Sequence, residues 1–141
     1  MGRYLSIDYG TKRCGIAVTD PLKMIASGID TVASHELMKF LESYFKKEDV
    51  ECVVVGKPLQ MDDTPSESFI HVDRFVQAFK KRFPDMRVEW MDERFSSKMA
   101  VQAMIDGGMK LKDRKKKENI DKISAAIILQ SFLEEENNNK V

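Results

Sequence analysis

The stretch that decides the fold reads Tyr4-Leu-Ser-Ile-Asp-Tyr-Gly-Thr-Lys-Arg-Cys-Gly-Ile-Ala-Val-Thr-Asp20. It consists of two short apolar runs joined by a tight, basic turn. The alternation over residues 4–8 predicts a strand in which Asp8 shares a face with Ser6. A carboxylate at the end of a central strand is costly to bury unless a cation, a metal or a ring of donors compensates it. Asp8 is therefore the first candidate site residue.

The composition is that of one folded, highly charged domain. The chain has 141 residues, of which 43% are hydrophobic and 33% are charged, and a domain of this size buries about two-thirds of its unfolded surface. The formal net charge is zero, which neither supports nor excludes a nucleic-acid partner. The segment 110–117 is strongly basic, and such a local patch can bind a polyanion. We expect a single domain over residues 1–136 and a polar tail over 137–141.

Cysteine usage and hydropathy bear on the compartment. Cys14 and Cys52 both lie in apolar, strand-like runs and are expected to be buried free thiols of a reducing compartment. No apolar run approaches the ~20 residues of a membrane span, and the chain begins directly with a strand instead of a signal peptide. The expected location is the cytoplasm, with no membrane segment.

Periodicity and turn residues predict the order of the elements. We expect strands at 3–8, 13–19, 24–31, 51–56 and 87–91, and helices at 35–47, from the capping segment Thr64–Glu67 to about 83, from Ser96 to Gly107, and at 119–135. The order is βββαβαβα plus a C-terminal helix. It predicts an α/β protein with a mixed five-stranded sheet flanked by helices.

Acidic residues occur where several of these elements end or begin. Asp8 ends the first strand, Glu93 follows the fifth, and Asp121 lies in the first turn of the last helix. Because sites in α/β sheets form beyond the carboxyl ends of strands, Asp8 and Glu93 could share a crevice. Converging carboxylates keep protons or bind cations, and oxygen ligands suit Mg²⁺ or Mn²⁺. Two such ions could serve phosphodiester hydrolysis. The alternative, that each acid caps a helix or pairs with a nearby cation, stays open.

Four segments resemble the YqgF/RuvX family. They are Ser6–Asp20, Val54-Val-Gly-Lys-Pro-Leu59, Met91-Asp-Glu-Arg-Phe-Ser-Ser97 and Asp121-Lys-Ile-Ser-Ala-Ala-Ile-Ile-Leu129. The resemblance spans almost the whole chain, with the motifs in the family's order. It implies an RNase H-like fold and a nuclease, which processes the 5′ end of pre-16S ribosomal RNA in some members and resolves Holliday junctions in others.

The resemblance also assigns the acids. The family's acidic positions correspond to Asp8, Glu93 and Asp121, with Asp92 as a weaker fourth candidate. It implies that the first three are the catalytic acids, and if they converge we expect them to hold Mg²⁺ or Mn²⁺, as two ions. A departure from the family pattern is Lys57, where the loop commonly carries leucine; the change adds positive charge, which favours a polyanionic ligand.

Basic side chains near these motifs are candidates for binding nucleic acid. They are Lys12, Arg13, Lys57, Arg94, Lys115, Lys116 and Lys117. Solvated surface cations are the alternative for most of them, and Arg94 could instead brace Glu93. A junction resolvase must act as a symmetric pair, so a homodimer is a further expectation with that substrate.

Two alternative hypotheses assign the chain to other classes of protein. The segment Ile7-Asp-Tyr-Gly-Thr11 also resembles the first phosphate loop of actin and Hsp70-type ATPases. Those proteins need two facing domains, and this chain is long enough for one. The second rival is a binding module that keeps the fold and the basic segment but catalyses nothing; the presence of all three acids counts against it.

Overall fold

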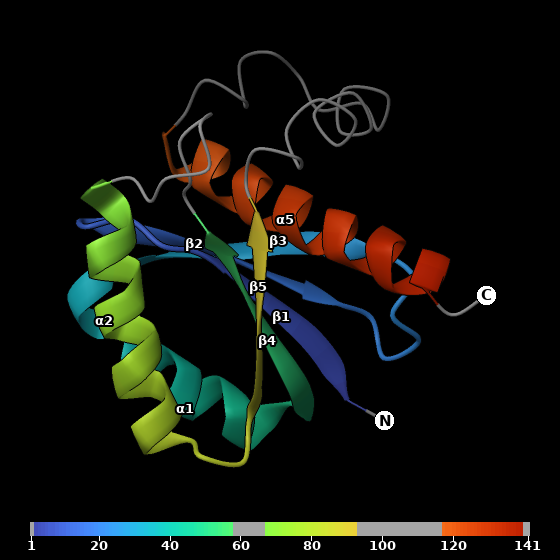
Figure 1. Ribbon diagram of the computed structural model, residues 1–141, viewed down its shortest axis with the longest axis horizontal. Helices are drawn as coiled ribbons and strands as arrows, with labels where there is room; N and C mark the ends of the chain where they lie inside the picture. The colour runs from blue at the N-terminus through green and yellow to red at the C-terminus, as the bar shows by residue number, and fades with distance from the viewer. Residues whose placement is uncertain (1, 58–66, 93–116, 140–141) are drawn as a thin grey trace.

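The computed structural model describes residues 2–57, 67–92 and 117–139, and these form a sheet between two layers of helices (Figure 1). The sheet has five strands in the order β3-β2-β1-β4-β5. The strands are β1 (Arg3–Asp8), β2 (Arg13–Thr19), β3 (Ala26–Ala33), β4 (Val50–Lys57) and β5 (Arg87–Asp92). The first three pair antiparallel, whereas β4 runs parallel to both β1 and β5. The mixed sheet predicted from the sequence is confirmed.

Each face of the sheet has its own helical layer. The helices α1 (Leu37–Lys47) and α2 (Glu67–Arg82) cover one face, and α5 (Lys117–Asn139) covers the other (Figure 1). Leu5 and Ile7 of β1 join the core under α1 and α2, while Tyr4 belongs to the core under α5. The alternation expected of β1 is therefore correct. Within the described residues, none of the helices combines the length and apolar character that a membrane crossing requires.

The strand β3 begins two residues later than the sequence pattern predicted. A carboxylate oxygen of Asp20 accepts hydrogen bonds from the backbone amides of Met24 and Ile25, both at 2.9 Å. These bonds hold the preceding residues as a turn, in which Lys23 adopts the left-handed conformation at φ 59°. The same bonds lower the pKa of the Asp20 carboxyl group. Residues 24 and 25 are therefore part of the turn, and pairing with β2 starts at Ala26.

Other boundaries differ by small amounts. A short 3₁₀ helix, η1 (Ser34–Glu36), precedes α1, so the regular helix begins later than predicted. The last helix runs from Lys117 to Asn139 and continues into the residues expected to be a polar tail. The capping residues 64–66 and the helix predicted over 96–107 lie outside the described residues.

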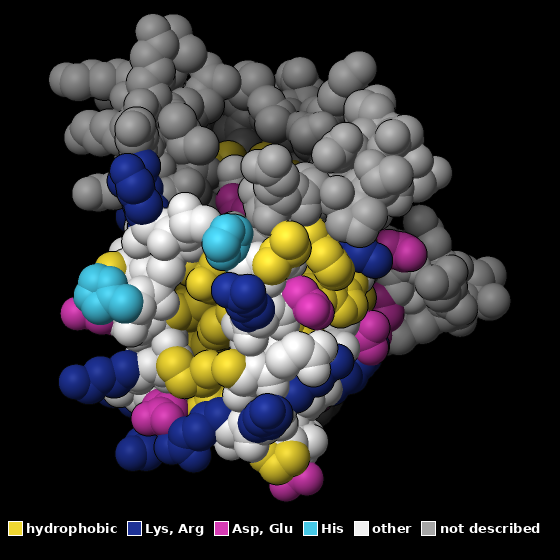
Figure 2. Space-filling model, turned by 60° about the vertical axis from the view of Figure 1, so that its left-hand side comes forward, with side chains coloured by type: hydrophobic (Ala, Val, Ile, Leu, Met, Phe, Trp, Pro, Cys, Tyr) yellow, Lys and Arg dark blue, Asp and Glu magenta, His cyan; other side chains and the backbone are white. Residues whose placement is uncertain are grey.

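The surface over α1 and α2 is a mixture of apolar and charged side chains. Figure 2 shows hydrophobic side chains between basic and acidic ones on this side of the molecule. Phe40, Tyr44 and Phe75 are partly buried against the core here. His35 and His71 are exposed.

The parallel strands share one edge, which we call the carboxyl edge. It is formed by the last residues of β1, β4 and β5, namely Asp8, Lys57 and Asp92. Ile7 pairs with Val55, and Lys57 pairs with Asp92, so the three strands end at nearly the same level. In sheets of this kind, sites form beyond such an edge.

Candidate active site

The strand β1 places Asp8 on the face covered by α5. Side chains alternate along a strand, so Asp8 shares its face with Ser6 and Tyr4. The Ser6 hydroxyl is fully buried and donates a hydrogen bond of 2.6 Å to the carbonyl oxygen of Ala125 in α5. A carboxylate two residues further along β1 therefore lies on the α5 face of the carboxyl edge.

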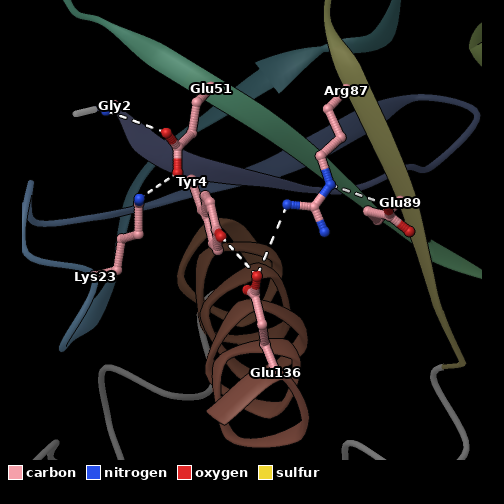
Figure 3. Close-up of polar contacts among 7 residues, drawn as sticks. All are labelled: Gly2, Tyr4, Lys23, Glu51, Arg87, Glu89 and Glu136. Carbon is pink, nitrogen blue, oxygen red and sulfur yellow. Dashed lines mark hydrogen bonds and ion pairs between the residues drawn. The ribbon is translucent and has the colours of Figure 1, made fainter. Parts of the chain in front are cut away.

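The helix α5 runs antiparallel to β1, and its contacts with the strand fix that direction. Towards the beginning of β1, the Tyr4 ring packs edge-on against Phe132 at 5.8 Å between ring centroids. The Tyr4 hydroxyl donates a hydrogen bond of 2.9 Å to a carboxylate oxygen of Glu136 (Figure 3). Later residues of α5 thus lie beside earlier residues of β1, and the helix starts at the end where β1 terminates.

The direction of α5 determines at which end of the sheet Asp121 lies. The residue lies in α5, one turn before Ala125, and Ala125 is held by Ser6. Because the helix runs antiparallel to β1, the turn with Asp121 is displaced from Ala125 towards the carboxyl edge. The structure brings this turn of α5 to the end of the sheet that carries Asp8. The side chain of Asp121 and all of Glu93 lie outside the described residues.

Small residues allow α5 to lie close to the sheet. The core on this face contains Ala17, Cys52, Ala125 and Ala126, all buried. At Gly28 of β3, an added Cβ would lie 2.8 Å from backbone and side-chain atoms of Lys122 in α5, so a larger residue would push the helix away. Burial raises the pKa of the Cys52 thiol to about 12, which makes it a packing residue and not a nucleophile.

Strand alternation separates Asp92 from Asp8. Met91 belongs to the core under α5, whereas Val88 and Trp90 pack against the core under α1 and α2. Asp92 follows Met91 and therefore points to the α1 and α2 face. This residue, the weaker fourth candidate, shares the carboxyl edge with Asp8 but not its face.

Comparisons with known proteins identify the family of this chain. The family model RuvX, described as Holliday junction resolvase, matches residues 2–135. The chain belongs to the RuvX family.

Curated relatives cover nearly the same length. A protein of Christiangramia forsetii is 62% identical over 135 residues, which is 96% of this chain and 100% of the relative. A protein of Flavobacterium psychrophilum is 53% identical, covering 94% of this chain and 97% of its own, and one of Phocaeicola vulgatus is 52% identical, covering 95% and 96%. All three are named "Putative pre-16S rRNA nuclease". Membership of the RuvX family confirms the family resemblance and agrees with the RNase H-like fold.

Two of the basic candidates lie in the turn between β1 and β2, next to Asp8. Lys12 is exposed and Arg13, the first residue of β2, is partly exposed. Gly10 makes this turn tight, because a Cβ there would clash with the carbonyl oxygen of Arg13. In this RuvX-family chain the turn thus places positive charge at the carboxyl edge beside an acid.

The other basic candidates are described to different extents. Lys57 ends β4 and holds its amine 5.5 Å from the centre of the Phe69 ring, a cation–π contact on the α2 side. Lys117 is the first residue of α5. Arg94, Lys115, Lys116 and the side chain of Lys117 lie outside the described residues.

The donor set decides which metal this RuvX-family site could take. Within residues 2–57, 67–92 and 117–139, no group of three His, Cys, Asp or Glu side chains is placed to hold an ion. Of the three proposed ligands, Asp8 is the one whose side chain is described. Carboxylates without histidine or cysteine suit Mg²⁺ or Mn²⁺ better than zinc.

Proposed function

We propose that this protein is a metal-dependent nuclease whose site is formed by Asp8, Glu93 and Asp121. One observation supports this most: Asp8 lies on the α5 face, and the turn of α5 that carries Asp121 lies at the same end of the sheet. In the sequence, Glu93 directly follows Asp92, with which β5 ends at the carboxyl edge. Three acids from three segments would meet at one edge, within a single domain over residues 1–136.

These carboxylates would hold two Mg²⁺ or Mn²⁺ ions. When bound, such a pair supplies an activated water and stabilises the leaving oxygen of a phosphodiester. The chain's own contribution is to fix three carboxylates on a rigid strand, a strand end and a helix, which preserves their spacing. Lys12 and Arg13, in the turn beside Asp8, would bind the phosphates that flank the cleaved bond.

The substrate we propose is the 5′ end of precursor 16S ribosomal RNA, in the cytoplasm. It is the activity in the names of relatives that cover 96% and 94% of this chain. The second candidate is a four-way DNA junction, which the family description favours and which would require a homodimer. The remaining basic candidates, Lys57, Arg94, Lys115, Lys116 and Lys117, would extend the contact with either polyanion.

A side-by-side cleavage assay tests the proposal. A precursor ribosomal RNA fragment and a four-way DNA junction are incubated with the protein and Mg²⁺, Mn²⁺ or a chelator. We expect metal-dependent cleavage of the RNA, reduced by about a thousandfold or more in Asp8→Asn, Glu93→Gln and Asp121→Asn, because each variant removes a ligand charge. The variants should still bind the substrate.

The matched control is Asp30→Asn, which makes the same chemical change on an exposed residue of the edge strand β3. It should cleave like the wild type. Unchanged turnover in all three site variants would exclude the two-metal site. Binding without cleavage of either substrate by the wild type would favour the rival, a binding module without catalysis.

A further inference from the structure

The turn between β1 and β2 is held by Ser34, the residue that follows β3. The backbone amide of Ser34 donates a hydrogen bond of 3.0 Å to the carbonyl oxygen of Lys12. Its hydroxyl donates a second one, of 2.5 Å, to the carbonyl oxygen of Gly10. One residue therefore binds two carbonyl groups of a turn that lies more than twenty positions earlier in the chain.

The Ser34 hydroxyl has no second role as a helix cap. Ser34 opens η1, but the cap position is Ala33, and no side chain among the described residues caps this helix. The Cys14 thiol also lies close, 3.5 Å from the Ser34 hydroxyl and 3.7 Å from the Gly10 carbonyl oxygen. A thiol is a weak donor. Without the Ser34 hydroxyl, the Gly10 carbonyl oxygen would keep the Cys14 thiol, a weaker hydrogen-bond donor.

The start of the turn is fixed on its other side. The Tyr9 ring stacks on Phe75 of α2 at 5.2 Å between centroids, which anchors the residue directly after Asp8. Gly10 has no room for a Cβ beside the Arg13 carbonyl oxygen. Packing therefore holds residue 9, and Ser34 holds residues 10 and 12. The backbone between Asp8 and β2 has little freedom left.

We propose that Ser34 is a positioning residue that sets the turn so that Lys12 and Arg13 meet the substrate phosphates beside Asp8. The inference rests on the proposed function, because it assigns these two cations a phosphate. Ser34 itself touches no substrate. It acts through the two carbonyls that determine where the backbone of the turn lies.

The test compares Ser34→Ala with Ser34→Thr, which keeps the hydroxyl, and with the control Ser27→Ala, which changes an exposed serine of β3. We expect Ser34→Ala to raise KM for the RNA fragment, and Kd measured without metal, by about fivefold, with kcat within about twofold. The dependence of Kd on salt should become shallower, since fewer phosphate contacts form. Ser34→Thr and Ser27→Ala should match the wild type.

A purely structural role predicts a different pattern. It would lower the fraction of active protein, and hence the apparent kcat, while KM and the salt dependence stay unchanged; that result overturns the proposal. If Ser34→Ala does not fold, Ser34→Cys, which keeps the volume and a weaker donor, takes its place with the same expected rise in KM and Kd.

The two proposals can fail separately. A wild type that binds RNA but does not cleave it overturns the nuclease proposal, and the metal-free Kd still decides the role of Ser34. Backbone amide NMR signals of residues 10–13 give a second readout, and they should shift in Ser34→Ala and not in Ser27→Ala. Unmoved signals together with an unchanged Kd contradict the inference even if cleavage is normal.

Discussion

The two faces of the sheet are packed in different ways. Under α1 and α2 the core is rich in aromatic rings: Phe45, Phe79 and Phe83 contact one another with centroids 5.0–6.1 Å apart. Under α5 the core combines larger residues such as Leu129 and Leu133 with small ones: alanines, a cysteine and the buried Ser6, which contacts α5. Bulky rings stabilise a fold through their buried area. Small residues let a helix approach a strand closely, and the acid Asp8 lies on that second face.

The largest expected effect on stability is on the aromatic face. Phe79 is 1% exposed and contacts three other phenylalanines. Phe79→Ala should lower the free energy of unfolding by about 3–5 kcal/mol, since it leaves a cavity. Urea denaturation measures this change. Cleavage per folded molecule should stay close to that of the wild type. A loss of cleavage larger than the loss of folded protein would show that packing on this face also determines activity.

A substitution on the small-residue face should instead lower cleavage more than stability. Ala125→Leu adds three carbons at a position that is 0% exposed, next to the carbonyl group that Ser6 binds. Overpacking costs about 1–3 kcal/mol and should displace α5 from β1. We therefore expect a loss of cleavage larger than the loss of folded protein, measured as kcat per folded molecule.

The control for that variant is Ala78→Leu, which makes the same change on the exposed side of α2. It should leave stability and cleavage within the error of the assays. Equal effects of the two substitutions would contradict a special role for close packing under α5.

A smaller effect is expected at the amino end of β1, where α5 is tied to the sheet. Burial, with the hydrogen bond to Glu136 as the second cause, raises the pKa of Tyr4 to about 12 (Figure 3). Tyr4→Phe removes that bond and should cost about 1 kcal/mol at neutral pH. Cleavage should change little, because the bond lies far from the carboxyl edge.

The pH dependence of this difference follows from the raised pKa. The unfolded chain loses the Tyr4 proton near pH 10, whereas the folded protein keeps it to about pH 12. The contribution of Tyr4 to stability is therefore complete below pH 10 and is lost as the pH rises from 10 to 12. Urea titrations at several pH values should show the advantage of the wild type over Tyr4→Phe shrinking in this range. A constant difference would contradict the raised pKa.

Local patterns in the sequence predicted a large part of this architecture. Alternation along β1 placed Asp8 on the correct face because the period of a strand is local information. The same rule, applied to Met91, could have placed Asp92 on the other face. The predicted start of β3 was wrong because the Asp20 side chain forms hydrogen bonds within the turn. The pattern of apolar residues does not show that such bonds form.

Contacts between residues that are far apart in the sequence could not be predicted from sequence patterns. Ser6 and Ala125 are 119 positions apart, and Ser34 and Gly10 are 24 apart. Nothing in the composition or the spacing of these serines distinguishes them from serines at the surface. Their role depends on which strand and which helix the topology brings together.

The most direct test of the central claim is where a divalent ion binds. Mn²⁺ titrated into the ¹⁵N-labelled wild-type protein broadens amide signals near its site, and Mg²⁺ in excess should reverse the broadening. Our account predicts broadening at residues 7–9 at the end of β1 and at residues 120–124 of α5, abolished by Asp8→Asn and unchanged by Asp30→Asn. Broadening confined to the acidic residues 134–136 near the end of α5, or unaffected by Asp8→Asn, would contradict a metal site at the carboxyl edge.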